Sequence, residues 1–102
     1  MIGSVVIFGH SFRLTVGAMM RVERETGVDF PALLEQMEDR PSVTRVAHII
    51  AAAMHNGQGG TVEEGAAFID QHGFSDVMAS LADLIGEAFA TSEDAGKNGK
   101  TP

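Results

Sequence analysis

The 102-residue sequence contains no cysteine, so it can form neither a disulfide framework nor a thiolate metal site. It also has no apolar run of the roughly 18–20 residues that a membrane-spanning helix needs. The first residues, MIGSVVIFG, lack the basic start and the cleavage site of a signal peptide. We therefore expect a single-domain cytoplasmic protein with no membrane partner.

Basic residues are missing from much of the chain. Residues 46–90 contain six acidic residues and no Lys or Arg, and the net charge of the whole chain is −7. Nucleic acid binding needs clustered Lys and Arg that replace phosphate counterions, so we expect no nucleic-acid partner. The acidic half is most simply a solvated surface, and the alternative is a basic protein partner that matches its charge.

Motifs of known enzymes are absent as well. The chain has no G-x-S-x-G, no Walker-type glycine loop and no H-E-x-x-H. The segment GQGG at 57–60 neither follows a strand nor precedes a Lys, so it predicts a flexible loop rather than a phosphate site. His48 and His55 are spaced to share a helix face, but two turns apart they are poorly placed for one metal ion. We expect a non-enzymatic protein without a catalytic residue, cofactor or metal.

The N-terminal segment SVVIFGHSFRLTV is rich in β-branched and aromatic residues and is interrupted once, at Gly9-His10. Glycine at the first position of a two-residue loop suits a type II′ turn. This pattern predicts a short β-hairpin.

A helical period begins after Gly17 and is interrupted within the stretch VERETGVDFPALLEQM. Gly27 tolerates the left-handed φ that a helix end needs, Asp29 can cap the next helix, and Pro31 fits its first turn. The apolar residues of this second helix recur at helical spacing: Phe30, Leu33, Leu34 and Met37. The stretch therefore predicts two helices joined at an angle by a very short turn.

Two further helices carry clear start and stop signals. Ser42 can cap a third helix, which ends in HNGQGG. Thr61 and Glu64 have the spacing of a capping box, and this fourth helix is expected to run to His72 and stop at Gly73.

A fifth helix is expected to be capped by Ser75 or Asp76 and to run to about Ala90. The tail at 91–102 has almost no apolar residue and is predicted to be disordered. The fold class is therefore mainly α: a short N-terminal β-hairpin followed by about five short helices packed as a small orthogonal bundle within residues 1–90.

The fifth helix has a wide apolar sector, about 160° at an ideal ~100° per residue. It comprises Val77, Met78, Leu81, Leu84, Ile85, Ala88 and Phe89. We favour a central position in the core as the explanation; the alternative is that one margin is left for another chain, including a second copy. Met20 and Phe68 also lie off the main stripes of their helices. The candidate partner-binding residues are therefore Met20, Phe68, Met78, Ile85 and Phe89.

The order of these segments resembles a phage tail assembly chaperone, in the small tail-cluster protein family of gene transfer agents and siphophages. The resemblance covers about residues 5–90. The segments that carry it are FRLTVGAMMRVERETG with Glu23, Thr26 and Gly27, then FPALLEQM, VTRVAHIIAAAMHNGQGG, VEEGAAFIDQHGF and the apolar closing helix.

This resemblance implies a protein that binds the tape measure protein, keeps its apolar helices in solution, and leaves when tail tube subunits polymerise. Tail tube subunits are then a second partner, and the protein is expected in the bacterial host cell and not in the mature particle. The alternative is a structural, tube-associated tail component that is retained in the particle. Methionines on an apolar surface would suit a chaperone because their flexible thioethers repack easily, although methionine fills ordinary cores equally well.

Overall fold

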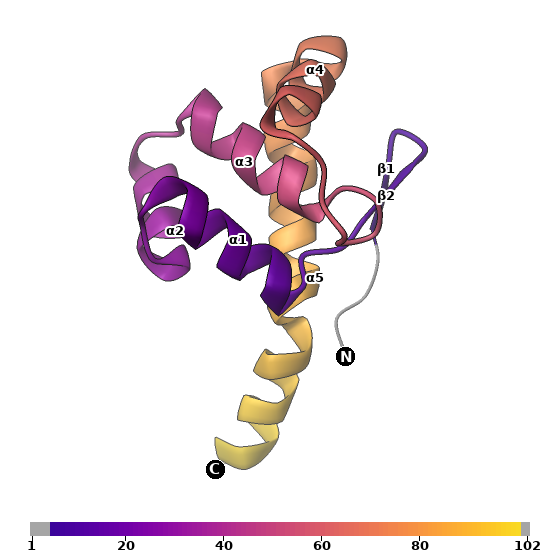
Figure 1. Cartoon of the computed structure of the whole chain (residues 1–102). Coiled ribbons are helices and arrows are strands. Elements are labelled where there is room, and N and C mark those ends of the chain that lie inside the picture. Colours follow the sequence, from indigo (N-terminus) through magenta and orange to yellow (C-terminus); the bar gives the residue numbers. More distant parts are fainter. Residues whose placement is uncertain (1–4, 101–102) are drawn as a thin grey trace.

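The computed structural model describes the backbone of residues 5–100 and the side chains of residues 5–89 (Figure 1). The element order is β1 (Val5–Ile7), β2 (His10–Phe12), α1 (Val16–Thr26), α2 (Phe30–Asp39), α3 (Val43–Ala53), α4 (Val62–His72) and α5 (Phe74–Lys100). This order confirms the predicted fold class, a mostly helical globule with an N-terminal hairpin. Among the described residues, none of the helices combines the length and the hydropathy that crossing a membrane would require.

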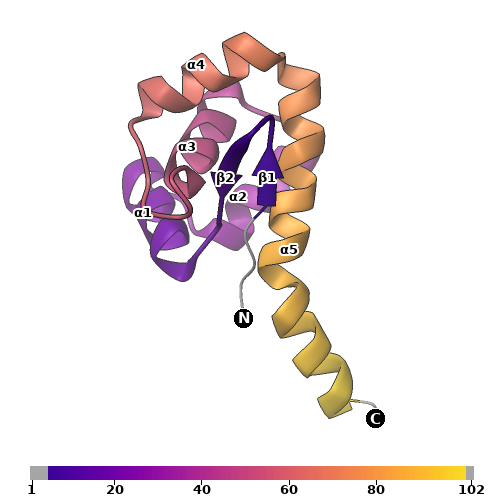
Figure 2. The same cartoon turned by 90° about the vertical axis from the view of Figure 1, so that its right-hand side faces the viewer.

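Helix α3 lies at the centre of the arrangement, with α1 and α2 on one side and α4 across one end, and the hairpin lies on the side of the molecule that faces the viewer in Figure 2. The buried apolar residues come from every element. The largest fully buried side chains are Phe12, Leu14, Leu33, Ile49, Ile50, Leu81, Leu84, Val22, Val46 and Val77. One core thus holds together the hairpin and all the helices that the structure describes.

The hairpin turn lies one residue earlier than predicted. Ile7 pairs with His10, so the two loop residues are Phe8 and Gly9. Both have positive φ, 51° and 83°, which is the pattern of a type I′ turn and not of the predicted type II′ turn. A bulky residue rarely adopts positive φ. Phe8 is held there by a tertiary contact, because its ring stacks on His72 of α4 at 4.1 Å and 3°.

The joint between α1 and α2 follows the prediction at Gly27, whose φ is 73°. The capping of α2 differs from the prediction. Asp29 occupies the N-cap position but makes no side-chain capping bond. The amide of Phe30 instead donates to Oε2 of Glu23 at 2.7 Å. Because α2 turns back on α1, a carboxylate one turn before the end of α1 reaches the start of α2.

Helix α1 begins at Val16, slightly before the predicted start, because Thr15 caps it by accepting from the amide of Ala18 at 2.9 Å. The predicted cap of α3 is confirmed, since Ser42 accepts from the amide of Arg45 at 3.3 Å.

The predicted capping box of α4 is confirmed in both directions. Thr61 accepts from the amide of Glu64 at 3.1 Å, and the Glu64 carboxylate accepts from the amide of Thr61 at 2.8 Å. Farther along α4, Gly65 is buried where the helix crosses α3. A Cβ at this position would overlap the carbonyl oxygen of Ala47 and lie 3.2 Å from the Cβ of Ala51. The absence of a side chain at Gly65 therefore allows the two backbones to approach closely.

Helix α5 departs from the prediction at both ends. It begins at Phe74, directly after Gly73, and not behind a cap at Ser75 or Asp76. It also continues to Lys100, where the sequence predicted a helix end near Ala90 and a disordered tail from Thr91. No glycine or proline lies between Ala90 and Ala95, and the helix also continues through Gly96 and Gly99. The last turns of α5 consequently extend past the rest of the molecule (Figure 2).

Candidate functional site

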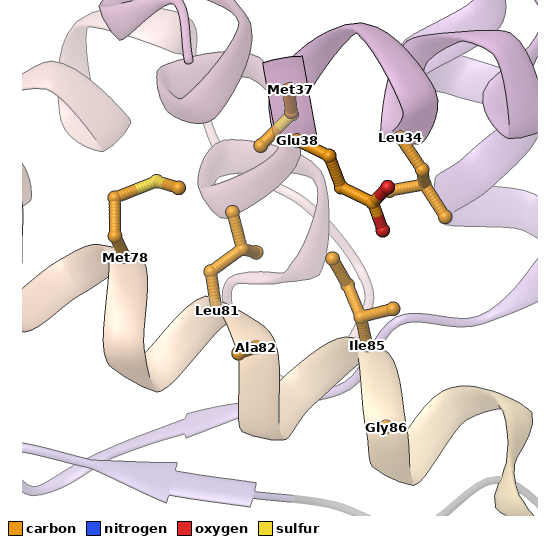
Figure 3. Close-up of a pocket in the computed structure, with 8 residues that line it drawn as sticks. All are labelled: Leu34, Met37, Glu38, Met78, Leu81, Ala82, Ile85 and Gly86. Carbon is orange, nitrogen blue, oxygen red and sulfur yellow. The ribbon is translucent and has the colours of Figure 1, made fainter. Parts of the chain in front are cut away.

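An apolar groove with a volume of about 370 Å³ lies between α2 and α5 (Figure 3). We call it the α2–α5 groove. It is lined by Leu34, Met37 and Glu38 from α2 and by Met78, Leu81, Ala82, Ile85 and Gly86 from α5.

The two walls are placed by the buried residues of their helices. Phe30 and Leu33 are buried on α2, while Val77 and Leu84 are buried on α5. These anchors tie each helix to the core on one side. Two of the lining residues, Met37 and Leu81, are themselves buried in the core, and the half-buried Leu34, Met78 and Ile85 form the margin beside them.

The chemistry of the groove is that of a binding surface for apolar side chains. Met37 and Met78 lie on opposite walls, with Leu34 and Ile85 beside them (Figure 3). Burying one large apolar side chain contributes about 1.5–3 kcal/mol, and methionine adapts its shape to different occupants. Among the described residues that line the groove, Glu38 alone carries a charge.

Three of the five predicted partner-binding residues lie together on α5. Met78 and Ile85 line the groove and are half-buried, and Phe89 is 38% exposed one turn beyond Ile85. We favoured a central core position for α5. This is wrong for the side of α5 that carries Met78, Ile85 and Phe89, because the described residues of the chain leave that side partly exposed. Met20 is 55% exposed on α1 and does not line the groove.

Phe68 was predicted to face a partner, and this is wrong because its side chain is only 4% exposed. Its ring lies 5.1 Å from that of Phe12 and 4.6 Å from that of His72, and it also contacts Phe8 at 6.1 Å. The hairpin, which the sequence did not place, covers this side of α4. Phe68 therefore anchors the hairpin to the helices.

Sequence reasoning missed the α2 wall of the groove. Leu34 and Met37 were assigned to the apolar stripe of α2, and that stripe was taken to face the core. This is confirmed for Met37, which is 6% exposed, whereas Leu34 is only half-buried. Its spacing shows which side of α2 is apolar, but nothing local shows that α5 lies opposite part of it. Glu38 carried no signal at all as a groove residue.

A second, more polar cleft lies between the hairpin and the loop after α3. It has a volume of about 340 Å³ and is lined by Gly9, His10, Ser11, Met54, His55 and Asn56. Within the part of the chain that the structure describes, no group of three or more His, Cys, Asp or Glu residues is arranged to hold a metal ion.

The two histidines that were expected to share a helix face do not do so. Helix α3 ends at Ala53, and His55 lies in the loop beyond it with a φ of 54°. His48 is on the helix, where its Nδ1 lies 3.1 Å from Oε1 of Glu25 on α1.

The glycine loop after α3 uses its amides internally. The amide of Gly59 donates to the carbonyl of Met54 at 2.9 Å, and that of Gly60 donates to the carbonyl of Ala51 at 2.7 Å. These bonds satisfy carbonyl groups at the C-terminal end of α3. The two amides are therefore not directed at a phosphate.

No protein-family model, curated protein or solved structure matches this chain.

Proposed function

We propose that this protein is a tail assembly chaperone of a phage or gene transfer agent that binds the tape measure protein non-covalently during tail morphogenesis. The α2–α5 groove is the observation that carries the proposal: it is an apolar groove with the half-buried Leu34 on one wall and the half-buried Met78 and Ile85 on the other. Such a surface can bind apolar helix faces of different sequence, because methionine repacks at little cost.

The role requires no chemistry beyond binding. The groove holds the apolar face of a tape measure helix in place of water, which keeps that helix from aggregating. The chaperone acts in the cytoplasm of the bacterial host and dissociates when tail tube subunits assemble around the tape measure protein. It is therefore non-enzymatic and is absent from the mature particle.

Co-expression with the tape measure protein from the same tail gene cluster tests the proposal. We expect the tape measure protein to move from the insoluble to the soluble fraction and to co-purify with this chain. The control is co-expression with an unrelated small acidic protein, which should leave the tape measure protein insoluble. If the tape measure protein stays insoluble with both partners and this chain is found in purified particles in many copies, it is instead a structural tail component.

A further inference from the structure

The apolar lining of the α2–α5 groove continues along α5 beyond the groove. Met78, Ala82, Ile85 and Phe89 follow one another at i, i+4, i+7 and i+11, which is the a/d spacing of a heptad repeat. At ~1.5 Å rise per residue this strip is about 17 Å long, or roughly three helical turns. Phe89 is 38% exposed, and α5 continues past it to Lys100.

A strip with this spacing fits the apolar side of another helix that runs along α5. Side chains at a and d positions pack between those of a facing helix that has the same repeat. On the α2 wall, the half-buried Leu34 then contacts the same occupant from its other side (Figure 3). The hollow has a volume of about 370 Å³, so it accepts apolar side chains of a helix that lies over it, between α2 and α5.

The charges at the groove determine which kind of helix fits. Glu38 lines the α2 wall, and Glu35 is exposed one turn earlier on the same helix. No Lys or Arg is among the described lining residues, and residues 46–90 contain none at all. A second copy of this chain, with a net charge of −7 and acids on the same helices, would bring like charges together.

We propose that the α2–α5 groove binds an amphipathic helix of another protein, with apolar residues at a and d positions and Lys or Arg along the flank that faces α2. This inference rests on the proposed chaperone function and specifies which segments of a partner the chain recognises. Basic residues on that flank meet Glu35 and Glu38, while the apolar residues cover Met78, Ile85 and Phe89.

Two synthetic helical peptides test the proposal directly. Both are about 21 residues long, or three heptads, with the same Leu and Ile at a and d positions. One carries Lys at the flanking positions and the other carries Glu. Fluorescence anisotropy with the full chain at low salt should show the Lys peptide binding at least about tenfold more tightly. This difference should shrink as salt is added, because exposed charges are screened.

Variants locate the binding in the groove. Ala82 lines the groove and is exposed, so Ala82→Glu should preserve the fold. It should weaken the binding of the Lys peptide by about tenfold or more, because the new carboxylate would be desolvated. The matched control is Ala67→Glu on α4, where the residue is also exposed but does not line the groove, and binding should not change. Phe89→Ala is a second variant that should also weaken binding.

Charge reversal tests the flank. Glu38→Lys should weaken the binding of the Lys peptide and strengthen the binding of the Glu peptide. Glu87→Lys alters the net charge equally but lies on the side of α5 away from the groove, about 170° from the strip at ~100° per residue, so its effect should be much smaller.

Equal binding of the two peptides, or unchanged binding to Ala82→Glu and Phe89→Ala, would overturn the proposal. So would a dimer of the wild-type chain that Ala82→Glu dissociates, because the occupant would then be a second copy. The proposed function and the proposal for the groove can be refuted independently of each other. If Ala82→Glu still solubilises the tape measure protein, the chaperone function stands without the groove. If the Lys peptide binds but the tape measure protein is never solubilised, the groove stands without that function.

Discussion

Replacing Gly65 with alanine should destabilise the protein, although alanine is the better helix former. Alanine in place of glycine within a helix contributes about 1 kcal/mol of stability. At Gly65 the added Cβ would overlap the carbonyl oxygen of Ala47 and approach the Cβ of Ala51. The obstacle is backbone of a neighbouring helix and cannot rotate away, so α3 and α4 must separate. Overpacking of this kind costs about 1–3 kcal/mol. With the upper end of this overpacking cost and the gain from alanine, we expect the free energy of unfolding to fall by about 2 kcal/mol.

Gly86→Ala is the matched control because Gly86 is also helical, but a Cβ there meets nothing within 4 Å. This variant should be more stable than wild type by about 0.5–1 kcal/mol. Urea unfolding monitored by far-UV circular dichroism measures both free energies of unfolding. In thermal unfolding, a loss of 1 kcal/mol should lower Tm by about 4–8 °C for a chain of this size. If Gly65→Ala stabilises the protein as much as Gly86→Ala does, the close crossing of α3 and α4 is wrong.

Two further predictions concern local contacts that the sequence did not reveal. Glu23→Ala should lower the free energy of unfolding by about 1 kcal/mol because it removes the acceptor for the amide of Phe30, whereas Asp29→Ala should have little effect. Urea unfolding compares the two, and a larger loss for the Asp29 variant would show that the predicted cap forms after all. Phe8→Ala should lower the free energy of unfolding by about 1 kcal/mol, because it removes the ring that stacks on His72 while the turn still needs a positive φ at this position. Phe8→Asn should be more stable than Phe8→Ala because Asn-Gly suits a type I′ turn, and equal stability of the two would contradict the turn assignment.

The α5 side of the candidate site was predictable from the sequence, and the α2 side was not. The wide apolar sector of α5 drew attention to Met78, Ile85 and Phe89, and these residues lie on one side of that helix. The same reasoning selected Phe68, which is buried, since a position off the main stripe does not show whether another element covers it. Helical periodicity shows which side of one helix is apolar, and it contains no information about the neighbour that this side meets.

The sequence by itself determined those helix ends whose signals act over a few residues, whereas both ends of α5 differ from the prediction. Gly27 permits the left-handed φ that ends α1, and Thr61 and Glu64 satisfy each other's amides at the start of α4. The tertiary structure decided what depends on distant segments. It placed the His72 ring of α4 against the ring of Phe8, at a hairpin turn one residue earlier than predicted. It also set α2 beside α5, which created the groove from the apolar stripe of α2 and the wide apolar sector of α5.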